Sequence, residues 1–217
     1  MPHVVLLGDS IFDNQPYVQP GEPDVIRQLR ARLPPGWHAT LLAVDGSVTA
    51  DVSRQLTRLP TDATHLIVSV GGNDALGQLD VLGASATSVA EVFAQFAAIQ
   101  DQFEQSYRRM LDAVLTRALP TVVCTIYNGN FPDALFQRLA TLGAAIWDDV
   151  ILRAAIERGL PVLELRLICA DPADYANPIE PSAHGGDKLA GAIVNVLAGH
   201  DFTQRRTAIY TRPAASR

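Results

Sequence analysis

Charged residues, cysteines and long apolar runs are all scarce in this chain of 217 residues. Charged side chains make up 18% of it and the net charge is −6, so the composition argues against the basic surface that nucleic-acid binding needs. No apolar stretch approaches the roughly 20 residues of a membrane-spanning helix. The N-terminal segment MPHVVLLGDS also lacks the basic start and long apolar core of a secretory signal. We therefore expect a cytoplasmic protein with no membrane span and no nucleic-acid partner.

Motifs for metals, nucleotides and disulfides are missing as well. The two cysteines, Cys124 and Cys169, stand in the apolar runs TVVCTI and LRLICA, which predicts buried reduced thiols. No histidine, cysteine or aspartate pair has the spacing of metal ligands on one element. No glycine-rich phosphate-binding motif follows the first apolar run. The sequence thus predicts neither a metal nor a nucleotide cofactor.

The chain does contain a regular alternation of two kinds of segment. Five short apolar runs rich in β-branched residues lie at 3–8, 38–44, 64–70, 120–127 and 161–168. They are continuous, as expected for parallel strands covered on both faces. Segments with helical periodicity lie at 22–33, 51–59, 88–118, 132–158 and 186–199.

This alternation predicts an α/β fold, in which a five-stranded parallel sheet lies between two layers of helices. We expect residues 1–200 to form one domain. Residues 201–217 are polar and basic without periodicity, and we expect them to be a tail that packs along the surface or frays.

Small and polar residues follow several of the predicted strands. Ser10 follows the first strand, Gly46 the second and Asn73 the third. His184 lies in the loop that we expect after the fifth strand. In open α/β sheets, ligands bind beyond the carboxyl ends of the strands, so these residues should converge on one edge.

Those residue types match the needs of acyl transfer. That reaction requires a hydroxyl nucleophile, a base to take its proton, and hydrogen-bond donors for the developing oxyanion. Ser10 can supply the nucleophile and His184 the base. The backbone N–H of Gly46 and the side-chain amide of Asn73 can supply donors.

The ordered set of GDSIFDN, a glycine after the second strand, GGND and a C-terminal histidine resembles the SGNH (GDSL-type) hydrolase family over about residues 3–198. The resemblance implies a three-layer α/β/α fold with strand order 2-1-3-4-5. It implies that Ser10 is the nucleophile and that the Ser10 N–H, the Gly46 N–H and the Asn73 amide form the oxyanion hole. It further implies that His184 is the general base and that no cofactor is needed.

The loop before the last helix departs from the family's pattern. Members usually carry an aspartate three residues before the histidine, where this chain has Pro181. Glu180, Asp171, Asp174 or a backbone carbonyl could orient His184 instead. Pro181 forces Glu180 into an extended conformation that need not face the histidine. This favours a dyad of serine and histidine, supported by a carbonyl or a more distant partner.

The predicted function is that of a serine esterase, which hydrolyses small-molecule carboxylic esters through an acyl-enzyme. Because little chain lies outside the core, we expect an open, shallow site for short acyl chains, with the segment 75–106 as its wall or flap. A thioesterase or a carbohydrate acetyl esterase would share the mechanism. A catalytically degenerate binding or regulatory protein would instead account for Pro181. The sequence predicts no particular oligomeric state.

Overall fold

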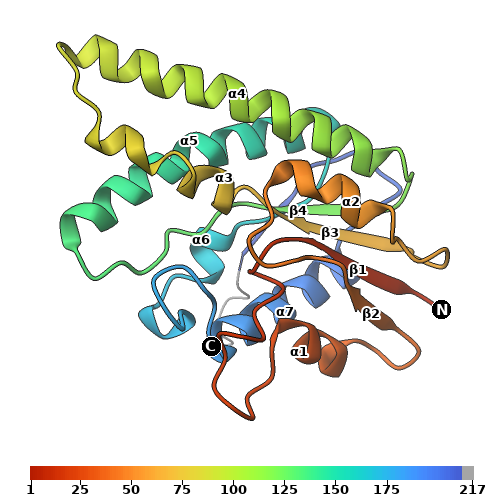
Figure 1. Ribbon diagram of the computed structural model, residues 1–217. Helices are drawn as coiled ribbons and strands as arrows, with labels where there is room; N and C mark the ends of the chain where they lie inside the picture. The colour runs from red at the N-terminus through yellow and green to blue at the C-terminus, as the bar shows by residue number, and fades with distance from the viewer. Residues whose placement is uncertain (212–217) are drawn as a thin grey trace.

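A computed structural model, which describes residues 1–211, shows a parallel sheet between two layers of helices (Figure 1). The strand order is β2-β1-β3-β4-β5-β6, and each neighbouring pair is parallel. The strands are β1 (His3–Gly8), β2 (His38–Leu41), β3 (His65–Ser69), β4 (Thr121–Cys124), β5 (Val162–Leu163) and β6 (Ile209–Tyr210). The predicted α/β/α fold and the order 2-1-3-4-5 are confirmed, and a sixth strand is added at the edge.

Alternate residues of β1 show how the core is divided into two halves. Val4 and Leu6 pack into one half, with α1 (Val25–Arg32) and α7 (Ala183–Gly199). Val5 and Leu7 pack into the other half. That second half is covered by α2 (Val52–Leu56), α4 (Val89–Leu115) and α5 (Ala134–Arg158). These four side chains are fully buried, as expected for a central parallel strand.

The short elements lie mainly at the carboxyl edge of the sheet. They are α3 (Gly72–Leu76), α6 (Leu165–Ile168) and the 3₁₀ turns η1 (Thr49–Asp51), η2 (Leu79–Gly83) and η3 (Pro172–Asp174). The long helices α4 and α5 lie side by side on one face of the sheet (Figure 1).

The predicted strand at 161–168 is wrong in its second half. The strand β5 ends at Leu163, and α6 follows directly. The Glu164 side chain accepts a hydrogen bond from the Arg166 N–H, and the Leu165 N–H donates to Thr125 Oγ1 at 2.8 Å. These side-chain acceptors bind backbone donors that a continued strand would have offered to its neighbours.

The last helix begins earlier than predicted, and this moves His184. Ser182 is the N-cap of α7, and its hydroxyl accepts a hydrogen bond from the Gly185 N–H at 3.2 Å. The helix therefore starts at Ala183 rather than at residue 186. His184 consequently lies in the first helical turn, and its expected place in a loop is corrected.

The described part of the predicted tail packs against the body of the protein. The Arg205 side chain donates to the backbone carbonyls of Arg158 and Glu157, and β6 pairs with β5. Residues 212–217 lie outside the described residues. Cys124 and Cys169 are buried free thiols, as predicted. Within residues 1–211, none of the helices combines the length and apolarity needed to cross a membrane.

Candidate active site

The turn after β1 is built so that Ser10 stands at the carboxyl edge of the sheet. Gly8 has φ +130°, and a Cβ atom on it would lie 1.7 Å from the backbone oxygen of Ser69. Only glycine fits this approach of two neighbouring strands. The Gln55 side chain accepts from the Gly8 N–H at 2.8 Å and donates to the Gly8 carbonyl at 2.7 Å. The residues that deliver Ser10 are therefore held from both sides.

Asp9 braces this turn. Its Oδ1 accepts a hydrogen bond from the Ile11 N–H at 3.3 Å, a bond that aspartate side chains often make in turns. Asp9 is 7% exposed, and burial raises the pKa of its carboxyl group to about 8. Asp9 lies in the same pocket as Ser10.

The loops after β2 and β3 are tied to each other. Asn73 lies in the first turn of α3, and its Nδ2 donates to the Ser47 carbonyl at 3.0 Å. Asp74 accepts hydrogen bonds from the backbone N–H and the hydroxyl of Thr49, at 3.0 and 2.8 Å. One of the two Nδ2 protons of Asn73 is thereby used to fix the amide, and no acceptor among residues 1–211 takes the second.

Gly46 lies in the turn between Val44 and Ser47 with φ +76°, a conformation that favours glycine. It is exposed, and it does not belong to the lining of the pocket that contains Ser10. The Asp13 carboxylate accepts a hydrogen bond from the Asp45 N–H at 3.0 Å, which ties this loop to the turn after β1. The predicted Gly46 N–H donor thus lies in a braced loop near Asn73.

Glu180 lines the same pocket as Ser10. The Ser10 hydroxyl hydrogen-bonds to the Glu180 carboxylate, which lowers the pKa of Glu180, but burial is the larger effect and raises it to about 7. Glu180 is 5% exposed. Oε2 of this carboxylate is buried without a hydrogen-bond partner among the described residues.

The His184 side chain faces Asp174 rather than Ser10. Its Nε2 lies 3.6 Å from Oδ1 of Asp174, which also binds Lys188 Nζ at 2.6 Å. Its side chain is 60% exposed. Among the described residues, the lining of the Ser10 pocket includes Glu180 but not His184, and no hydrogen bond joins His184 to Ser10. Of the predicted site residues, the structure thus brings Ser10, Asn73 and Glu180 to one pocket.

Two asparagines that the sequence analysis did not assign to the site hold Glu180 in place. Asn14 is fully buried, and its Nδ2 donates to the Pro181 carbonyl at 3.1 Å, so it joins the Ser10 loop to the Glu180 loop. Oδ1 of Asn177 accepts from the Glu180 N–H at 2.9 Å. Asn177 precedes Glu180 by three residues, the same spacing that the family uses for aspartate and histidine. That spacing is the sequence signal that could have drawn attention to Glu180.

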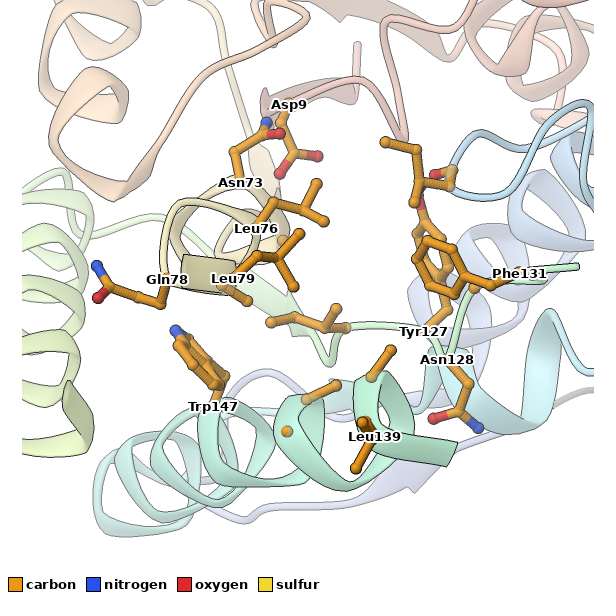
Figure 2. A pocket seen from close by; sticks show the side chains of 18 of the residues that line it. Asp9, Asn73, Leu76, Gln78, Leu79, Tyr127, Asn128, Phe131, Leu139 and Trp147 are labelled. Atoms are coloured by element: carbon orange, nitrogen blue, oxygen red, sulfur yellow. Dashed lines mark hydrogen bonds between the residues drawn. The ribbon is translucent and has the colours of Figure 1, made fainter. Parts of the chain in front are cut away.

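The rest of the pocket is mainly apolar. Figure 2 shows Asp9 and Asn73 together at one end of the pocket, and Trp147 and Leu139 at the other. Its cavity volume is about 120 Å³. The apolar lining comes chiefly from Val70, Leu76, Leu79, Val81, Leu82, Phe96, Ile126, Phe131, Phe136, Leu139 and Trp147. The segment 75–106 forms one wall, as predicted.

A serine hydroxyl beside a carboxylate, with an amide donor nearby and an apolar pocket attached, is suited to attack on an acyl group. The fold and this set of groups define the class of serine hydrolases with an α/β/α sandwich. The sequence identifies the family within that class. Residues 6–187 match the GDSL-like Lipase/Acylhydrolase family, so the chain belongs to this family and is a serine ester hydrolase.

Solved structures share the fold at low sequence identity. An extracellular lipase from Streptomyces rimosus is 20% identical with a TM-score of 0.64, over 93% of this chain and 100% of that one. A G-D-S-L family lipolytic protein from Veillonella parvula is 12% identical with a TM-score of 0.67, over 92% and 100%. A carbohydrate acetylesterase from Sinorhizobium meliloti is 14% identical with a TM-score of 0.63, over 91% and 99%. No curated protein matches the sequence.

Proposed function

We propose that this protein hydrolyses small carboxylic esters with short acyl chains, through an acyl-enzyme on Ser10. The observation that carries the proposal is the position of Ser10 at the polar end of an apolar pocket of about 120 Å³. A nucleophile placed there meets the carbonyl carbon of an ester whose acyl chain lies against the apolar walls.

The pocket volume sets the expected chain length. An apolar cavity of about 150 Å³ accommodates benzene, so about 120 Å³ suits an acyl chain of about four to six carbons. Leu79 and Leu139 line the pocket and are also 38% and 39% exposed, so the apolar lining continues to the protein surface. Longer chains would therefore extend from the pocket into solvent and gain less apolar contact.

The oxyanion donors are the Ser10 N–H, the Gly46 N–H and the second Nδ2 proton of Asn73. The bond from Asn73 to the Ser47 carbonyl fixes the amide before substrate arrives. Donors that are already oriented stabilise the developing charge without reorganisation during the reaction.

Gly143 offers a direct test of the acyl pocket. It lies in α5 and lines the pocket, and a Cβ atom on it would meet nothing within 4 Å. The substitution Gly143→Leu should fill part of the cavity and also suit the helix better than glycine. We expect wild type to reach its highest kcat/KM on 4-nitrophenyl butyrate or hexanoate, and Gly143→Leu to shift that maximum to the acetate.

The matched control is Gly191→Leu in α7, which also has open space at Cβ but does not line the pocket. It should keep the wild-type chain-length profile. A wild-type preference for acetyl esters of sugars over all alkyl esters would contradict the assignment of the apolar pocket to the acyl chain. Hydrolysis by Ser10→Ala at a substantial rate would contradict the acyl-enzyme itself.

A further inference from the structure

We propose that Glu180, not a histidine, is the general base that takes the proton from Ser10. This inference rests on the proposed acyl-enzyme at Ser10 and goes beyond it by naming the proton acceptor. It is carried by the contact between the two side chains in one pocket, and by the position of His184 on another side of the same segment.

The contact has the chemistry of a nucleophile and its base. The Ser10 hydroxyl donates to the Glu180 carboxylate, and Glu180 and Ser10 both line the acyl pocket. Oε2 of Glu180 is buried and accepts no hydrogen bond from the described residues. A buried carboxylate oxygen without a partner is costly to keep, so its position beside the nucleophile points to a role in the reaction.

Several contacts keep Glu180 in this place without using its carboxylate. Its N–H donates to Oδ1 of Asn177, and its carbonyl accepts from the Ala176 N–H at 2.8 Å. The Asn14 amide holds the next carbonyl, that of Pro181. The Tyr127 hydroxyl donates to the preceding carbonyl, that of Ile179. The backbone on both sides of Glu180 is thus fixed, and the side chain is left for the pocket.

The absence of an aspartate from its usual place agrees with a carboxylate base. A histidine that takes up a proton becomes a cation and is stabilised by a neighbouring carboxylate. Glutamate instead becomes neutral, so a second carboxylate would give it no such stabilisation. Asn177, three residues before Glu180, supplies a neutral amide that binds the backbone.

The electrostatic surroundings make Glu180 a better proton acceptor than an exposed glutamate. The titratable groups that face it are Asp9 in its own pocket, Asp45 after β2, Tyr17 after β1 and Tyr127 after β4. Burial and the negative charge of Asp45 raise the pKa of Glu180 and so favour its protonated carboxyl, against the hydrogen bond from Ser10, which lowers it. A general base works best when its pKa is near the working pH.

The proton transfers balance. Glu180 takes the Ser10 Oγ proton as Oγ bonds to the acyl carbon, and the neutral Glu180 then protonates the alcohol oxygen as the carbon–oxygen bond of the ester breaks. In the second half of the reaction, Glu180 takes a proton from a water molecule as the water oxygen bonds to the acyl carbon. It then returns that proton to Ser10 Oγ as the carboxylic acid leaves. The carboxylate is regenerated in each half, and no other co-reactant is used.

The position of His184 supplies the matched control. Its imidazole is directed at Asp174, whose carboxylate is fully buried and paired with Lys188. This arrangement places the imidazole beside a buried carboxylate at the start of α7, outside the lining of the Ser10 pocket. Glutamine at 184 would remove the imidazole and leave the cap of the helix, which Ser182 provides, intact.

The test is kcat/KM on 4-nitrophenyl butyrate between pH 5 and 9 for wild type, Ser10→Ala, Glu180→Gln, Glu180→Asp and His184→Gln. Glu180→Gln should lose about 10²–10⁴-fold, the usual contribution of a general base. Glu180→Asp should fall between it and wild type, since it keeps a shorter carboxylate. The kcat/KM values of wild type and His184→Gln should differ by less than threefold. In both proteins kcat/KM should rise as the pH passes about 7.

Loss of 10²-fold or more in His184→Gln would overturn the proposal, because the imidazole would then be the base. A kcat/KM of Glu180→Gln above one tenth of the wild-type value would also overturn the proposal. If Ser10→Ala were inactive in the same assay, that result would leave the acyl-enzyme on Ser10 supported. An active Ser10→Ala would overturn both. Thermal melting of each variant establishes that it is folded. If wild type does not cleave the butyrate, the rate of Ser10 labelling by a fluorophosphonate serves as the same readout.

Discussion

Two segments meet at Ser10, and they relate differently to the family pattern. The segment from Gly8 to Asn14 keeps the pattern GDS, and its contacts with Ser69 and Gln55 are those of a turn that presents a nucleophile. The segment from Asp171 to His184 has lost the usual aspartate, and the group that it brings to Ser10 is Glu180. The comparison teaches that a nucleophile turn can be retained while the side chain that meets the nucleophile differs from the histidine of the family pattern.

Removing an oxyanion donor should have the largest effect on kcat. Asn73→Ala should lower kcat by about 10²–10³-fold, the usual effect of losing one such donor, with a smaller change in KM. Steady-state kinetics on 4-nitrophenyl butyrate measure both constants. Asn73 also binds the Ser47 carbonyl, so the melting temperature of the Asn73→Ala variant should be compared with that of wild type. A change confined to KM would contradict a role in the transition state.

The buried carboxyl of Glu180 should make the stability of the protein depend on pH. Burial raises the pKa of Glu180 from 4.5 to about 7, so between these values the folded protein binds more protons than the unfolded chain. The free energy of unfolding therefore falls as the pH rises from 5 to 8, and the Glu180 contribution to this fall is about 2.5 kcal/mol. Urea unfolding at the two pH values measures it.

Glu180→Gln removes that titration and should show a pH dependence smaller by about this amount. Burial also raises the pKa of Asp9, to about 8, so a dependence of the same sign should remain in the variant. Equal pH dependence in wild type and Glu180→Gln would show that the Glu180 carboxyl is not buried as described.

The contacts of Asn14, which join the Ser10 segment to the Glu180 segment, should have a smaller effect on activity. Asn14→Ala leaves the Pro181 carbonyl and the Val25 N–H without their side-chain partner. Each buried group left unpaired costs about 1–3 kcal/mol, so we expect the two together to cost about 2–6 kcal/mol of stability. Since Asn14 also fixes the distance between the two loops, kcat/KM should fall by about tenfold, more than the fraction unfolded explains. Unchanged activity in a folded Asn14→Ala would separate these contacts from catalysis.

The sequence was sufficient where local pattern determines structure. The continuous apolar run of β1, the GDS turn and the GGND motif after β3 predict the fold and the places of Ser10 and Asn73. The sequence was insufficient where one run of residues is compatible with either a strand or a helix. The run PVLELRLI is apolar throughout, and only the side chains of Thr125 and Glu164 convert its second half into a helix. The two-residue strand β6 is too short to show a period.

The orientation of Glu180 and His184 could not be predicted for a similar reason. Both residues lie in one short segment, and which of them faces the pocket depends on contacts distant in sequence. The bond from Asn14 to the Pro181 carbonyl spans 167 residues, and the cap at Ser182 places His184 in a helix near Asp174. Spacing alone favoured the histidine because its residue type matched the family pattern.

The most direct test of the Ser10–Glu180 pair is the rate at which a fluorophosphonate labels Ser10 as a function of pH, since this step isolates activation of the nucleophile. The account predicts that labelling of wild type and His184→Gln accelerates as the pH rises through about 7, while Glu180→Gln reacts at least 10²-fold more slowly and without that rise. Labelling of Glu180→Gln at the wild-type rate would contradict the account.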